Sequence, residues 1–451
     1  MYKMIYASTQ GSDHIKHNMP CEDFGLVHET DLCNVFAVAD GHGDSNCPRS
    51  QFGSETACRI AVAEMEKFCE DIGNNEWESR LLTEGKDSEG LVRQLVTSIV
   101  AKWVKTVNED LISAPLTETE KAGCGRYLER YEKGERLEHI YGTTLIAALL
   151  SESYLLLIQQ GDGRCVVFDR KGTVSQPIPW DDRCFANVTT SLCDEDAIQS
   201  FRYCLIDLDK TGVIACMAGS DGVEDSFPSM DMMHVFYRDL LIYAAENGTE
   251  ALNEYLAENL PEFSRKGSGD DVTICGIIDP ELITGCIPAF QHDNEIIERE
   301  NALHGLRERL QSMSGMGKLE ALKKHYDEAL ESVSEAERSL EEAVNTLDLY
   351  NEDLRRMNQD ETDGLENLKI WIRLFDSIFP GNRKAAFEKK VMELNEKKEL
   401  AEQKLEQSRK ALIPIEEEYY GYLAKKEELE LKIEEAEQSL DELREAGEYA
   451  P

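Results

Sequence analysis

Four short segments of the N-terminal half bring acidic residues next to glycine or to the ends of apolar runs. They are residues 20–24, with Glu22 and Asp23; 38–44, with Asp40; 217–223, with Asp221; and 267–273, with Asp270. An aspartate that leaves a strand into glycine has a fixed backbone root and an open approach, so several together offer the oxygen ligands that hard divalent cations prefer. Two such cations can acidify a shared water and hold phosphoryl oxygens during attack. Because a single Asp-Gly pair is more often a turn than a ligand, the prediction depends on all four segments.

The first 285 residues have the pattern of a mixed α/β domain. Helical stretches such as 54–68 and 91–111 separate short β-branched and apolar runs at 35–39, 145–149, 154–159, 166–168, 213–217 and 272–278. Strands outnumber helices, and some neighbouring strands are joined by short turns. This pattern favours antiparallel sheets with packed helices over a doubly wound parallel fold.

The last third of the chain has a heptad period. Apolar residues occupy every a and d position from 319 to 357, and a second run from 391 to 443 is interrupted only by Lys398, Ser408 and Lys426. This repeat predicts coiled-coil helices. After a first domain at 1–285 we therefore expect a coiled-coil arm at 286–451, composed of a helix at 291–357, an apolar tip insert at 358–385 and a helix at 386–447. The nearly equal helices favour an antiparallel hairpin, and a dimeric coiled coil along the same seams is the alternative.

Composition argues against several kinds of partner and compartment. The formal net charge of −41 argues against binding nucleic acid through phosphate contacts. No apolar run approaches the length of a membrane span, and the first residues lack the features of a secretory signal. The 13 cysteines include no C-x-x-C pair, which fits neither a disulfide framework nor a zinc site. We therefore expect a cytoplasmic protein with reduced thiols and no membrane span.

Six motifs follow one another over residues 5–280, in the order EDF, VADGHGD, GTTL, GDGR, GSDGV and GDDVT. This series resembles that of the PPM (type 2C) metal-dependent protein phosphatases. The resemblance implies an α+β fold, a four-layer α-β-β-α sandwich with Mg²⁺ or Mn²⁺ at one end of the two sheets. In this resemblance Asp40 matches the aspartate that bridges two core ions, the carbonyl of Gly41 a ligand of one of them, and Asp221 and Asp270 the remaining aspartate ligands.

The other acidic residues of the series match secondary positions of the family. Glu22 matches an acidic ligand found in some members, and Asp23 matches the neighbour that orients metal-bound water. Asp162, in the GDGR motif, matches the aspartate of a third, weaker ion. The resemblance also implies that residues 180–204 belong to the variable segment that influences substrate access.

One departure concerns the grip on the substrate. Many members carry an arginine shortly before the Glu-Asp pair to hold the substrate phosphate, whereas residues 14–20 here read HIKHNMP. This version resembles that of some bacterial members. His14 and Lys16 are therefore the candidates for binding phosphate or protonating the leaving alkoxide, since an imidazole titrates near neutrality. Arg49 and Arg164 are further candidate phosphate partners.

The resemblance implies a bacterial, cytoplasmic serine/threonine phosphoprotein phosphatase in which metal-activated water attacks the phosphate directly. Its partners would be a phosphoprotein substrate and a cognate Ser/Thr kinase. The arm would dock a partner protein, localise the enzyme or mediate self-association. The alternative is a catalytically weak phosphatase-like scaffold or sensor that acts through its coiled coil.

Overall fold

The computed structural model describes residues 1–451 except 44, 84, 186–187, 316, 361–381 and 449–451. The chain divides into two compact units, Met1–Glu298 and Arg299–Pro451, which we call the globular unit and the arm. The first turns of helix α12 (Ile287–Gly315) belong to the globular unit. The predicted domain boundary after residue 285 remains a prediction.

Two antiparallel five-stranded sheets form the centre of the globular unit. The first has the order β1 (Lys3–Thr9), β10 (Val272–Ile278), β9 (Val213–Gly219), β6 (Arg164–Asp169) and β7 (Val174–Ser175). The second has the order β2 (Phe24–Glu29), β3 (Asn34–Ala39), β4 (Leu145–Leu150), β5 (Tyr154–Gln160) and β8 (Arg202–Asp207). Every strand predicted from the sequence lies in one of these sheets, and β1, β2, β7 and β8 were not predicted.

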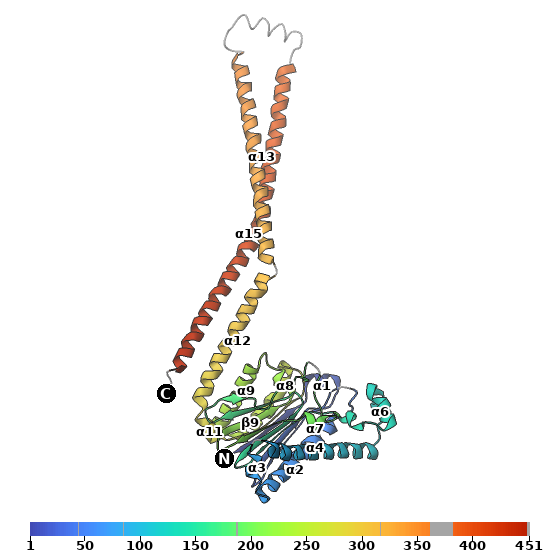
Figure 1. Ribbon diagram of the computed structural model, residues 1–451. Coiled ribbons are helices and arrows are strands. Elements are labelled where there is room, and N and C mark those ends of the chain that lie inside the picture. Colours follow the sequence, from blue (N-terminus) through green and yellow to red (C-terminus); the bar gives the residue numbers. More distant parts are fainter. Residues whose placement is uncertain (44, 84, 186–187, 316, 361–381, 449–451) are drawn as a thin grey trace. The chain divides into compact units, whose positions relative to one another are not determined.

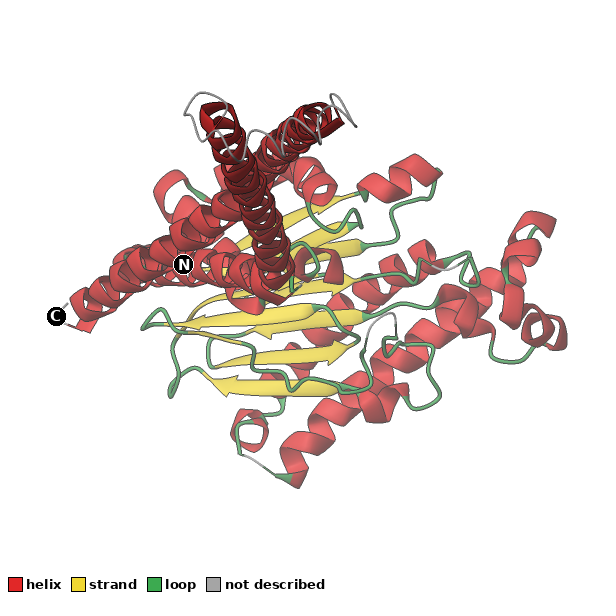
Figure 2. Cartoon of the chain, turned by 90° about the horizontal axis from the view of Figure 1, so that it is seen from above, coloured by secondary structure: helices red, strands yellow, loops and turns green. Residues whose placement is uncertain are grey.

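Long helices cover the outer face of each sheet, as Figures 1 and 2 show. Helices α2 (Ser50–Asn74) and α4 (Lys86–Ser113) pack on the second sheet, and α9 (Met230–Asn247) and α10 (Thr249–Lys266) on the first. Side chains alternate along β3, so that Val35 and Ala37 face the helices while Phe36 and Val38 join the core between the sheets. The four-layer α-β-β-α sandwich is therefore confirmed.

Short helices fill the connections between these layers. They are α1 (Ser12–His17), α3 (Glu78–Leu81), α5 (Glu118–Gly123), α6 (Leu128–Lys133), α7 (Ala197–Ser200), α8 (Asp221–Glu224) and α11 (Pro280–Thr284), with 3₁₀ turns at Gly125–Tyr127 and Leu137–Tyr141.

In the arm, which also holds the later turns of α12, helices α13 (Lys318–Asp360) and α15 (Asn382–Glu448) pack against each other in opposite directions (Figure 1). The ring of Tyr326 stacks on that of Tyr419 at 5.1 Å between centroids. Further along α13, Glu337 accepts a hydrogen bond of 2.7 Å from Arg409, which lies earlier in α15. This register runs antiparallel, so the helical hairpin is confirmed.

Two predictions remain to be compared with the structure: the tip insert and the absence of a membrane span. Most of the predicted tip insert at 358–385, including all of 361–381, lies outside the described residues. Among the helices that the structure does describe, every one is too short or too polar to cross a bilayer.

Candidate active site

Strand ends from both sheets bring the acidic motif residues to one region of the globular unit. Asp23 immediately precedes β2, and Asp40 immediately follows β3, whose Ala39 pairs with Phe24 of β2. Asp221 begins α8 just after β9, and Gly219 at the end of β9 pairs with Ile274 of β10. The two sheets are linked here because Ser220 Oγ donates a hydrogen bond of 2.6 Å to Asp23 Oδ2.

Asp40 and Asp221 form the acidic centre of this region. Each carboxyl shifts the pKa of the other, so the two side chains lie close together. Burial raises the pKa of Asp40 well above its usual value, and the neighbouring Asp221 and Asp23 raise it further. Burial also raises the pKa of Asp221 to about 7. Two adjacent carboxyls of this kind cannot both ionise easily unless a cation lies beside them.

The backbone around Asp40 is held by the GTTL motif. Asp40 N donates to Thr144 Oγ1 at 3.0 Å, and Asp40 O accepts from Thr144 N at 2.8 Å and from Thr143 Oγ1 at 2.9 Å. The next residue must be small, because a Cβ on Gly41 would lie 2.8 Å from the carbonyl oxygen of Glu22. The two threonines thus fix the backbone that presents the Asp40 carboxylate and the Gly41 carbonyl.

Glu22 has one occupied and one unoccupied carboxylate oxygen. Its Oε1 accepts a hydrogen bond of 2.5 Å from Ser50 Oγ, while its Oε2 is buried and has no hydrogen-bond partner among the described residues. Burial raises the pKa of Glu22 to about 7. A buried carboxylate oxygen without a donor is costly, and a cation would satisfy it.

His14 lies inside this region and contacts two aspartates. Its Nδ1 is 3.1 Å from Asp271 Oδ2 and 3.2 Å from the carbonyl oxygen of Pro20, and its Nε2 is 3.3 Å from Asp270 Oδ1. Lys16, one helical turn away from Asp13, is exposed, and its Nζ pairs with Asp13 Oδ1 at 2.7 Å.

Asp271 is a residue of this region that the sequence reasoning did not assign. Its side chain is buried and accepts hydrogen bonds of 2.6 Å from the backbone N–H groups of both Gly11 and Glu22. It therefore fixes the N-terminal segment that carries His14 and Glu22. The second aspartate of the GDDVT motif was the available signal, but its partners are more than 200 positions away.

The two arginines considered as phosphate partners are paired with carboxylates. Arg49 Nε lies 2.8 Å from Glu120 Oε1, and its Nη1 lies 2.9 Å from Asp110 Oδ2. Arg164 pairs with Glu224 through two nitrogens and stacks over the Trp180 ring at 3.7 Å. These contacts disfavour both arginines as ligands of a substrate phosphate.

The donors of this region suit a hard divalent cation by their chemistry, since they are carboxylate and carbonyl oxygens. Within the described residues, no group of three or more His, Cys, Asp and Glu side chains is arranged to hold a metal ion as it stands. The fit to a cation therefore depends on the unpartnered Glu22 Oε2 and on the adjacent Asp40 and Asp221 carboxyls. A Mg²⁺ or Mn²⁺ ion that keeps several waters needs few protein ligands.

Comparison with known proteins identifies the family. The sequence profile of protein phosphatase 2C matches residues 10–260, more than half of the chain, so the chain belongs to the protein phosphatase 2C family. No curated protein sequence matches it.

Several solved structures are similar to part of this chain at low identity. A bacterial serine phosphatase is 16% identical to this chain; the match covers 62% of this chain and 98% of the phosphatase chain, with a TM-score of 0.37. The serine/threonine phosphatase Stp1 from Staphylococcus aureus is 15% identical, covering 62% and 95%, with a TM-score of 0.37. The catalytic domain of the serine/threonine phosphatase PstP, in complex with two manganese ions, is 15% identical, covering 61% and 97%, with a TM-score of 0.35.

Proposed function

We propose that the globular unit is a metal-dependent protein serine/threonine phosphatase. The observation that carries this proposal is the adjacent carboxyl pair of Asp40 and Asp221 at the linked ends of the two sheets. Such a pair is unfavourable without a cation and favourable with one. Membership of the protein phosphatase 2C family supports the same reading.

The proposed cofactors are two core Mg²⁺ or Mn²⁺ ions and a third, weaker one. Asp40, the Gly41 carbonyl, Asp221, Asp270 and Glu22 would hold the core ions. Asp162 would hold the third. Bound there, the ions would lower the pKa of a water molecule and neutralise charge on the phosphoryl oxygens.

The remaining site residues act on water and substrate in this proposal. Asp23, held by Ser220, accepts a hydrogen bond from the attacking water and so orients it. Lys16 binds the substrate phosphate, because its exposed pair with Asp13 costs little to exchange. His14 donates a proton from Nε2 to the leaving alkoxide, while Asp271 and Pro20 hold its Nδ1.

We propose that the arm docks a partner protein or localises the enzyme. Its helices expose several apolar side chains outside the heptad seam, among them Leu349, Met392 and Ile413. The proposed partners are a phosphoprotein substrate, a cognate Ser/Thr kinase and a coiled-coil protein or a second copy of the chain.

The purified full chain tests the enzymatic proposal. Hydrolysis of para-nitrophenyl phosphate and of phosphoserine, phosphothreonine and phosphotyrosine peptides would be measured with Mn²⁺ and with a chelator. We expect Mn²⁺-dependent activity on the first two peptides, and a loss of about a thousandfold in Asp221→Asn, since metal catalysis supplies several kcal/mol. Equal silence of wild type and Asp221→Asn on every substrate would instead support the scaffold or sensor alternative.

A further inference from the structure

The turn that carries Asp162 is fastened through its backbone. Gln159 Nε2 donates to the carbonyl oxygens of Gly161, at 3.1 Å, and Gly163, at 2.6 Å. Gly161 N donates to Thr190 Oγ1 at 3.0 Å. Gly161 has a φ of +104°, and a Cβ there would lie 2.5 Å from Thr144, so the turn requires glycine.

Arg202, the first residue of β8, binds the same turn through its guanidinium group. Its Nη2 donates to Gly161 O and its Nη1 to Pro179 O at 3.0 Å. Its Nε is buried without a partner, and no ion pair of Arg202 occurs among the described residues. Burial lowers the pKa of Arg202. Arg202 is only partly buried, and its two printed hydrogen bonds go to backbone carbonyls rather than to a carboxylate. This arrangement is suited to holding the backbone of the turn in place.

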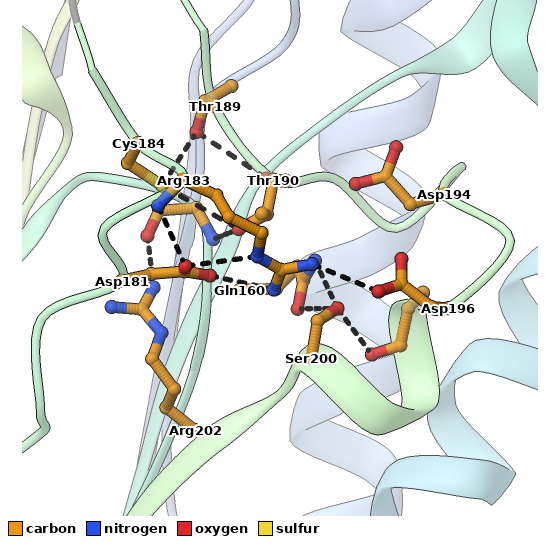
Figure 3. Close-up of polar contacts among 12 residues, drawn as sticks. Gln160, Asp181, Arg183, Cys184, Thr189, Thr190, Asp194, Asp196, Ser200 and Arg202 are labelled. Carbon is orange, nitrogen blue, oxygen red and sulfur yellow. Dashed lines mark hydrogen bonds and ion pairs between the residues drawn. The ribbon is translucent and has the colours of Figure 1, made fainter.

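The nearby Arg183 shows the ordinary arrangement. Figure 3 shows it directed at Asp181 and Asp196, and it forms ion pairs of 2.8 and 2.9 Å with them. It belongs to the same 179–190 segment, but its hydrogen bonds do not reach the turn at 161–163. The two arginines therefore differ in what they hold: Arg183 pairs with carboxylates, whereas Arg202 binds backbone carbonyl oxygens.

The Asp162 side chain contrasts with its fixed backbone. It is half-buried, and across the described parts of the chain no hydrogen bond or ion pair involves its carboxylate. By comparison, Asp194 in the same region accepts a hydrogen bond of 2.8 Å from Ser191 N. A rigid backbone with an unpartnered carboxylate is the arrangement expected of a ligand whose direction is set in advance.

We propose that Arg202, together with Gln159, is a positioning residue for Asp162. Both side chains donate to Gly161 O, and they thereby fix the backbone that presents the Asp162 carboxylate to a divalent cation. Arg202 also joins this turn to Pro179, so the backbone at Pro179 and the turn that carries Asp162 are held together. The inference rests on the proposed function, in which Asp162 holds the third ion.

Mn²⁺ binding to the full chain, measured by titration calorimetry, tests this inference without depending on activity. The reference is Asp162→Asn, which should remove the weakest binding step. Arg202→Met and Gln159→Leu should each weaken that step by about tenfold, as loss of an outer partner of a ligand typically does, and leave the tighter steps unchanged. Arg202→Lys should restore part of the affinity, and Arg183→Met is the matched control that should leave every step unchanged.

The outcomes distinguish failure of this inference from failure of the proposal that Asp162 holds the third ion. If Asp162→Asn leaves the binding curve unchanged, ligation by Asp162 fails and the inference fails with it. If Asp162→Asn removes the weak step but Arg202→Met and Gln159→Leu do not weaken it, the inference alone is overturned. A lower melting temperature in chelator with unchanged Mn²⁺ affinity would show a purely structural role. If Arg202→Met does not fold, Gln159→Leu decides.

Discussion

The globular unit and the arm obtain their order in different ways. In the globular unit the core strand residues Val35, Phe36 and Ala37 have no exposed surface, and they are buried by segments far away in the sequence. In the arm even a well-buried seam residue such as Leu347 keeps 7% of its surface exposed, and one antiparallel partner helix supplies its contacts. Tight long-range packing can hold carboxylates against their mutual repulsion, whereas a two-helix seam cannot.

Charged groups follow the same division. Asp271 in the globular unit is buried and receives two backbone N–H groups, while the Arg409–Glu337 pair of the arm is exposed at both ends. Exposed pairs contribute roughly 0–1 kcal/mol each, whereas a buried carboxylate depends on its donors. Substitutions of matched residues in the globular unit and the arm therefore test whether the two regions respond differently in activity and stability.

The largest effect is expected from Asp40→Asn. Hydrolysis of para-nitrophenyl phosphate should fall by at least about a thousandfold, because several kcal/mol of metal catalysis are lost. The same change should raise the melting temperature of the chelated protein at pH 8, since asparagine cannot ionise beside Asp221. A variant that is both inactive and less stable in chelator would contradict the idea that the Asp40 carboxylate serves catalysis while it destabilises the metal-free fold.

The pH dependence of the chelated wild type sharpens this point. The pKa of Asp221 is about 7 in the folded chain against a usual value of 3.8. The folded state therefore binds more protons, and the contribution of Asp221 to stability should fall as pH rises from about 4 to about 7. Urea denaturation in chelator should show this fall, and Asp40→Asn should show a smaller one. A stability that rises over that range would be the opposite sign.

Leu347→Asp should break the arm without harming the globular unit. Placing a carboxylate on the seam should cost about 3 kcal/mol or more of arm stability, comparable to losing a buried leucine. Circular dichroism should show an earlier loss of helix. Hydrolysis of para-nitrophenyl phosphate with Mn²⁺ should remain within about twofold of wild type. A parallel loss of activity would mean that the two units are not independent.

Substitution of one arginine in each region compares how much their ion pairs contribute to stability. Arg49→Met should lower the free energy of unfolding by about 3 kcal/mol, because Asp110 and Glu120 would lose a shared partner that is mostly buried. Arg409→Met in the arm should cost less than about 1 kcal/mol. Denaturation curves give both values. An increase in KM for phosphopeptides in Arg49→Met would restore Arg49 as a phosphate ligand.

The smallest effect is expected from two exposed lysines. Lys16→Met should raise KM for a phosphopeptide by about tenfold, since one charged hydrogen bond to phosphate is worth roughly 1.5 kcal/mol. Lys410→Met, on the exposed face of the arm, should change neither KM nor kcat. Steady-state kinetics distinguish the two. Equal behaviour of both variants would remove Lys16 from the site.

The sequence by itself determined the features that depend only on residues close together in the chain. An aspartate followed by glycine after an apolar run predicted Asp40 and, with one intervening serine, Asp221 as candidate site residues, because strand and turn signals lie within a few residues. The heptad seam predicted the helices of the arm for the same reason. The antiparallel sandwich followed from short strands joined by short turns and from the motif series.

Tertiary structure alone decided the partners of these groups. Asp271 meets Gly11 and Glu22, and Arg202 meets Gly161, only because strand register brings distant segments together. The packing of helices α2, α4 and α5 also paired Arg49 with Asp110 and Glu120, which sequence could not distinguish from a free arginine near the motifs. Local periodicity records which face of an element is buried, but the identity of the group across the interface depends on the packing of the whole unit.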